Sequence, residues 1–140
     1  MSANLDLVRS IFQAWTHGDI ESVLREHFEP TARLDLSENI FNPAVYVGYE
    51  EIARQRREVN EVWGLFEIEV ERLFEGEDVV VAFTHEHGRG EASGVEVDRD
   101  TAFLFRLRLG KVSEVRTYRD RDRALADSGL TPEHEATRPD

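Results

Sequence analysis

The feature that most constrains this chain is the stretch from residue 65 to residue 119, where apolar and polar side chains alternate. In residues 65–71, for example, Phe66, Ile68 and Val70 alternate with three glutamates. A period of two is typical of a β-strand with one buried face and one solvated face. Several such segments in series predict a curved antiparallel sheet against which the preceding part of the chain packs.

Turn residues divide this stretch into strands. Residues 75–78 form a turn into a strand over residues 79–87, and another strand follows Gly94. A tight turn at Gly110 leads into the last strand. In the strand after Gly94, four side chains occupy every second position and therefore face the same side of the sheet: Thr101, Phe103, Phe105 and Leu107.

Helical periodicity predicts three helices before the sheet. The first is capped by Asn4 and carries apolar residues at helical spacing up to Trp15, the second covers residues 20–28, and the third runs from Tyr49 to about Trp63. The arginines of the third helix are expected on its outer face as partners of nearby glutamates, rather than as an anion site. These arginines are Arg54, Arg56 and Arg57.

The remaining segments are short. Residues 32–36 predict a strand, and residues 37–48 predict a loop that could act as a lid over a pocket. Its apolar anchors are Ile40, Phe41, Val45 and Tyr46. Residues 120–130 predict a C-terminal helix. We expect one domain over residues 1–130 and a disordered tail over residues 131–140.

Composition narrows the function classes. The chain of 140 residues has a net charge of −12 at pH 7, which argues against nucleic acid and anionic membrane surfaces as partners. It has no cysteine, which suits a reducing compartment. No apolar run is long enough to span a bilayer, and we see no secretion signal. The expected location is the cytoplasm.

Several motifs, in order, resemble SnoaL-like proteins of the nuclear transport factor 2-like and ketosteroid isomerase-like superfamily. They are Ala14-Trp15 with Gly18-Asp19, Phe28-Glu29-Pro30, residues 46–52, residues 88–97 and residues 110–121. The resemblance implies an α+β fold, a cone-shaped, curved antiparallel sheet (a cystatin-like roll) that wraps three N-terminal helices around a pocket. It also implies a homodimer through the convex face of the sheet.

The family hosts many activities, so the fold does not give the function. The three positions that match the catalytic groups of ketosteroid isomerases are apolar here: Ile11, Leu36 and Phe103. The positions that match the catalytic aspartate–arginine–aspartate set of limonene-type epoxide hydrolases are Glu86, Thr84 and Thr117. Only Glu86 among them is a carboxylate. Both reactions are therefore disfavoured.

Glu86 and Asp35 are the candidate catalytic residues. If Glu86 faces the cavity beside Thr84, Thr101 and Phe103, burial disfavours its charged form and suits it to acid–base work. The alternative is a solvated Glu86 at the end of the core. Asp35 faces outward in the predicted register, but a slip of one residue would turn it into the pocket. Glu86→Gln is expected to abolish turnover with little effect on the melting temperature.

His85 and His87 share one face of a strand, and Glu91 follows at a spacing seen in metal-binding cupins. No histidine follows on a later strand, and both side chains are predicted to point to the convex side. We therefore predict no metal and no cofactor. Arg99 and Arg119 could meet an anionic ligand near the mouth, but pairs with Asp98, Asp100 or Asp120 explain them equally well.

The sequence thus predicts a pocket protein for a small, mostly apolar molecule, with cyclase-like or isomerase-like chemistry as one outcome. The alternative is a non-catalytic binding or dimeric interaction module whose cavity is filled by its own aromatic side chains. The predicted pocket residues are Trp15, Leu34, Leu36, Tyr46, Trp63, Phe66, Thr84, Thr101, Phe103, Thr117 and Arg119.

Overall fold

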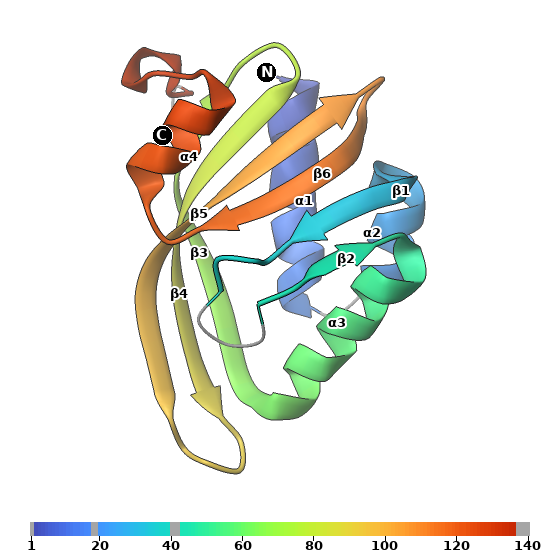
Figure 1. Ribbon diagram of the computed structural model, residues 1–140, viewed down its shortest axis with the longest axis vertical. Coiled ribbons are helices and arrows are strands. Elements are labelled where there is room, and N and C mark those ends of the chain that lie inside the picture. The colour runs from blue at the N-terminus through green and yellow to red at the C-terminus, as the bar shows by residue number, and fades with distance from the viewer. Residues whose placement is uncertain (1, 18–19, 40–42, 137–140) are drawn as a thin grey trace.

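The computed structural model describes residues 2–17, 20–39 and 43–136. In these ranges the elements, in chain order, are α1 (Ala3–His17), α2 (Ile20–His27), β1 (Phe28–Asp35), β2 (Val45–Val47), α3 (Tyr49–Val62), β3 (Trp63–Glu75), β4 (Val79–Gly90), β5 (Glu96–Arg108), β6 (Lys111–Tyr118), α4 (Arg121–Ser128) and a 3₁₀ turn over Pro132–His134. Figure 1 shows a bent sheet that curves around α1. The predicted α+β fold with a curved sheet is confirmed.

The six strands of the sheet lie in the order β2-β1-β6-β5-β4-β3. Strands β3 to β6 form an antiparallel meander, which the alternating sequence predicts. One pairing differs from the expectation, because β1 lies parallel to β6. The sheet is therefore mixed at this point.

The concave face of the sheet carries the main core, and α1 lies across it. Phe12 of α1 meets Phe103 and Phe105 of β5 edge-on, with ring centroids 5.2 Å and 5.5 Å apart. All three side chains are buried. The helical spacing of α1 and the strand parity of β5 thus meet in one aromatic cluster.

The convex face is partly covered by α4 (Figure 1). Ala124 and Leu125 of this helix pack in a second core cluster with residues of β3 to β6, including Phe83 and Leu104. Asp120 caps α4 by accepting from the backbone N–H groups of the first turn, and Gly129 ends it in a left-handed conformation.

Several boundaries differ from the sequence expectations. The hydroxyl of Ser2, rather than Asn4, accepts from the backbone of the first turn of α1, at Leu5 N. Strand β1 begins directly at Phe28, so it is longer than predicted and contains Pro30. The predicted lid loop contains β2, which pairs with β1. Its anchors Ile40 and Phe41 lie outside the described residues.

The segment after α4 lies against the sheet as far as it is described. Ala136 N donates to the carbonyl of Leu73, and Arg72 forms an ion pair with Glu135. Residues 132–136 thus lie alongside β3, in a segment where a disordered tail was expected. Residues 137–140 lie outside the described residues. No helix in the described part of the chain is long and apolar enough to cross a membrane.

Candidate functional site

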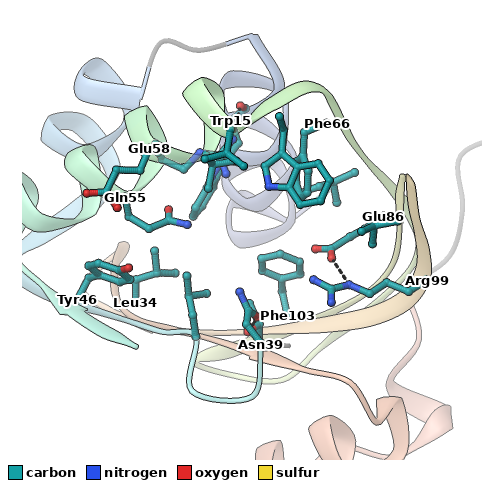
Figure 2. Close-up of a pocket in the computed structure, with 18 residues that line it drawn as sticks. Trp15, Leu34, Asn39, Tyr46, Gln55, Glu58, Phe66, Glu86, Arg99 and Phe103 are labelled. Carbon is teal, nitrogen blue, oxygen red and sulfur yellow. Dashed lines mark hydrogen bonds and ion pairs between the residues drawn. The ribbon is translucent and has the colours of Figure 1, made fainter. Parts of the chain in front are cut away.

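A pocket of about 360 Å³ opens between α3 and the concave face of the sheet, beyond the end of α1. Its volume lies within the range of small-molecule sites, roughly 300–1,000 Å³. Figure 2 shows side chains of α1, α3 and the sheet pointing into it from several sides. The described side chains therefore leave the cavity open, in contrast to the alternative of a filled cavity.

The apolar part of the wall consists of residues that the sequence predicted for the pocket. Six of them line it: Trp15, Leu34, Leu36, Trp63, Phe66 and Phe103. Leu34 and Leu36 come from the end of β1 and just beyond it, where their parity turns them to the concave face.

Two predicted polar residues also line the pocket. Tyr46 comes from β2, and Thr117 comes from β6. Thr117 Oγ1 donates to Asn39 Oδ1 at 3.1 Å, which holds Asn39 in the wall. Asn39 has no periodic neighbour in sequence, so no pattern indicated it.

Glu86 is buried in the wall, with only 5% of its surface exposed. Its carboxylate accepts from Arg99, at 2.9 Å between Nε and Oε1 (Figure 2). The two residues are direct partners across β4 and β5. The structure thus places Glu86 toward the cavity and away from solvent, and gives it a cationic partner in place of a purely apolar environment.

Arg56 is the second cation of the wall. It lies on α3, is 7% exposed, and donates from Nη2 to the carbonyl of Trp15 at 3.1 Å. Burial lowers the pKa of Arg56 to about 10, while the charge of Glu86 acts in the opposite direction. The guanidinium therefore stays charged at neutral pH.

The outer-face assignment of the α3 arginines was right for two of them and wrong for Arg56. Arg54 pairs with Glu58, and Arg57 pairs with Glu21. Arg56 follows Ile52 by four residues, and residues four apart share one face of a helix. Because Ile52 is fully buried, Arg56 is carried inward.

Four predicted site residues do not line the pocket. Thr84 and Thr101 are buried and bond to each other, with 2.7 Å between their hydroxyl oxygens, and Arg119 is exposed. Asp35 lies on the opposite face of β1 from Leu34.

Asp35 interacts with its own surroundings on that outer face. It accepts from Ser37 N at 2.9 Å and lies 3.9 Å from Arg116. Burial raises the pKa of Asp35, but the hydrogen bonds of Ser37 and the charges of Arg116 and Arg33 outweigh it and hold the pKa below its ordinary value. This carboxylate is therefore kept ionised. It lies away from the pocket because β1 has the register predicted from the sequence, which turns Asp35 outward.

The two histidines next to Glu86 point to the convex side. His85 pairs with Asp98 and Asp100, and His87 pairs with Asp98. In the described ranges, no group of three or more histidine and carboxylate side chains is placed to hold a metal ion.

Three side chains that line the pocket carry buried polar atoms that find no hydrogen-bond partner among the described residues. Trp15 Nε1, Gln55 Oε1 and Arg99 Nη1 are buried and make no hydrogen bond within the described part of the chain. Gln55 comes from α3 and lies on the same helix face as Ile52 and Arg56. Helical spacing could therefore have indicated Gln55. Arg99 was expected near the mouth, either at an anionic ligand or in a pair with Asp98 or Asp100, whereas the structure places it in the wall and pairs it with Glu86.

Comparisons with known proteins agree on the fold. Among solved structures, the chain is similar to a putative SnoaL-like polyketide cyclase from Jannaschia, with 22% identity, a TM-score of 0.73, and coverage of 93% of this chain and 94% of the other. It is also similar to a protein with a ketosteroid isomerase-like fold from Catenulispora acidiphila, solved in complex with trimethylamine, with 17% identity, a TM-score of 0.71, and coverage of 95% and 97%. These identities show the fold alone.

A further solved structure shares the fold, and a family model identifies the family. A nuclear transport factor 2-like protein from Burkholderia pseudomallei has 17% identity, a TM-score of 0.74, and coverage of 90% of this chain and 97% of the other. A comparison with curated protein sequences finds no significant match. The model of the SnoaL-like domain family matches residues 8–115, which is more than half of the chain. The chain therefore belongs to the SnoaL-like domain family.

Proposed function

We propose that this protein binds a small, largely apolar organic molecule in the pocket and that Glu86 acts on it as a general base. The observation that carries the proposal is a buried carboxylate in the wall of an open pocket, held by Arg99. Similar structures include putative polyketide cyclases, which agrees with chemistry on carbonyl compounds.

The geometry supports proton transfer in a definite way. Within the described residues, Arg99 occupies only the Oε1 atom of Glu86, so the second oxygen is available to a ligand. A carboxylate can take a proton from the carbon next to a carbonyl, and the guanidinium beside it can stabilise the enolate oxygen that forms. In an isomerisation the proton then returns from Glu86 to another carbon of the ligand. In an exchange, Glu86 first trades this proton for a deuteron from D₂O and then delivers the deuteron to the original carbon.

Hydrogen exchange tests this role without knowledge of the natural substrate. 2-Tetralone is an apolar bicyclic ketone with acidic protons next to its carbonyl. In D₂O we expect the wild-type protein to accelerate deuterium incorporation into 2-tetralone, followed by NMR, and Glu86→Gln to remove the acceleration while ketone binding persists.

The outcomes separate the two candidate functions. Binding of the ketone without faster exchange, or equal exchange by Glu86→Gln, would reject the base and leave a binding module. That second function is favoured by the ion pair with Arg99, since a paired carboxylate also serves as a fixed recognition group. Failure of all apolar probes to bind would reject the pocket function itself.

The proposal includes a homodimer through the convex face and a cytoplasmic location. Helix α4 covers the apolar part of this face, so a partner would contact the charged part around His85 and His87. Light scattering on purified protein tests the dimer, and a monomer at all concentrations would reject it. The absence of cysteine is compatible with the cytoplasm.

A further inference from the structure

The unpartnered polar atoms of the pocket define what a ligand must supply. An indole N–H and a guanidinium N–H can only donate, so Trp15 Nε1 and Arg99 Nη1 each require an acceptor. The amide of Gln55 can serve a donor or an acceptor, depending on its orientation. Trp15 is 4% exposed and Gln55 9% exposed, so bulk water has little access to satisfy them.

The arrangement in Figure 2 places these groups around the cavity. The Gln55 amide extends into the pocket from α3, and the Arg99 guanidinium extends into it from the side of β5. Trp15 lies at the end of α1. A buried donor without a partner is costly, and a ligand oxygen that accepts from it offsets that cost on binding.

The charges of the wall favour an anionic acceptor. Arg56 and Arg99 are two cations against the single carboxylate of Glu86, which leaves one positive charge in excess among these side chains; Arg56 and Glu86 are buried and Arg99 is half-buried. Glu58 also borders the pocket, but it is largely exposed and lies 3.7 Å from Arg54. The pocket is thus locally cationic in a chain whose net charge is −12.

We propose that the ligand of this pocket is an organic monoanion, in which an apolar ring system lies against the aromatic wall and an anionic oxygen accepts from Arg99 Nη1 and Trp15 Nε1. This inference rests on the proposed function of the pocket and specifies the ligand class. Charge-assisted hydrogen bonds from a guanidinium to an anionic oxygen are stronger than those to a neutral oxygen. The aromatic part is held by Trp63, Phe66 and Phe103.

Three probes of one shape and different charge test the proposal. They are 2-naphthoate, neutral 2-naphthamide and the 2-naphthylmethylammonium cation. Both tryptophans of the chain line the pocket, so quenching of intrinsic fluorescence reports binding, and calorimetry confirms it. We expect naphthoate to bind about tenfold more tightly than naphthamide, and the cation to bind most weakly.

Two variants locate the anion within the pocket. Arg99→Lys keeps the charge beside Glu86 but removes the second guanidinium arm, and Trp15→Phe keeps a ring but removes the N–H. Each should weaken naphthoate about fivefold or more while changing naphthamide by less than about twofold. Arg89→Lys is the matched control, because Arg89 is exposed on β4 and pairs with Glu96 away from the pocket.

The results distinguish the failure of this inference from the failure of the proposed function. If naphthamide or the cation binds as tightly as naphthoate, the monoanion assignment is overturned and the pocket function stands. If Arg99→Lys and Trp15→Phe leave the preference for naphthoate intact, the assigned contacts are overturned. If none of the three probes binds at millimolar concentration, the pocket function falls and the monoanion assignment falls with it.

Discussion

Glu86 and Arg99 face each other across β4 and β5 and form a largely buried ion pair, 2.9 Å from Nε to Oε1, in the wall of the pocket. The carboxylate side chain is 7% exposed and the guanidinium side chain 21% exposed. A pair in this position links stability to function, because either partner left alone is an uncompensated charge with little access to water.

Glu86→Gln is expected to abolish catalysed exchange and also to lower stability. Gln keeps an acceptor for Arg99 but loses the charge, and a hydrogen bond to a charged group contributes about 1.5–3 kcal/mol. At roughly 3–4 °C per kcal/mol for a chain of this size, the melting temperature should fall by several degrees. The pairing with Arg99 thus replaces the expectation from sequence that stability stays nearly constant.

Glu96→Gln is the matched control for this measurement. It removes the partner of Arg89 on the same two strands, but both side chains are more than half exposed. Exposed pairs contribute little, so the melting temperature should hardly change. If Glu86→Gln and Glu96→Gln lowered the melting temperature equally, the claim that the Glu86–Arg99 pair contributes more stability than the exposed pair would be contradicted.

Replacing both partners of the pair separates stability from function. Glu86→Leu with Arg99→Met removes the two charges together and fills the same wall with apolar atoms, a change that is often neutral or stabilising for a buried pair. We expect the double variant to melt at or above the temperature of Glu86→Gln, with no exchange activity and no preference for naphthoate. A lower melting temperature than that of the single variant would show that the pair itself stabilises the fold.

Much of the fold could be predicted because the sequence alternates strictly where strands pack on helices. Phe103 and Phe105 of β5 share one parity, and Phe12 of α1 meets them where helical spacing places it. Strand β2 was missed because three residues are too few to show the alternation of a strand, and because Val45 and Val47 are exposed. Its pairing depends on β1, which local sequence does not report.

The site could be predicted only in part, since the arginines of α3 were assigned to the outer face because they are charged. Glu86 was identified from its parity with Thr84, and the same reasoning applied to Arg99 would have found its partner. Arg56 and Gln55 share the inward face of α3 with Ile52, so periodicity should have outweighed their polarity. The contact of Asn39 with Thr117 joins a loop to β6, and no pattern in the sequence predicts it.

Arg121 is expected to hold α4 on the sheet. Its Nη2 donates to the carbonyl of Thr84 at 2.7 Å, its Nε donates to the carbonyl of Thr101 at 3.2 Å, and its guanidinium lies over the ring of Phe83. Arg121→Met keeps apolar contact but loses the donors, so denaturant unfolding should show a loss of about 2–3 kcal/mol. Arg123→Met removes a half-exposed arginine of the same helix that pairs with Glu38 but, within the described residues, makes no bond to the strand carbonyls, so it should lose less; a similar loss would contradict the assignment.

His85 provides a pH-dependent contribution to stability. Its ring lies between carboxylates of the convex face: it bonds to Asp100 at 2.8 Å, pairs with Asp98, and is the cross-strand partner of Glu69. The hydrogen bond to Asp100 is the largest influence on the pKa of His85; together with the charge and hydrogen bond of Asp98 it outweighs burial and raises this pKa above its ordinary value of 6.5. A raised pKa in the folded state means that the protonated ring favours folding.

The sign of this effect fixes the pH range in which it disappears. The contribution of His85 is fully present below pH 6.5, the pKa of the unfolded chain, and is lost as the pH rises through the higher pKa of the folded state. An NMR titration should therefore give His85 a pKa above 6.5, and Asp100→Asn should lower it because the charged acceptor is removed. His85→Gln should flatten the corresponding part of the curve of melting temperature against pH. A pKa at or below 6.5 in the wild type, or one that Asp100→Asn leaves in place, would contradict the assignment of Asp100 as the main partner.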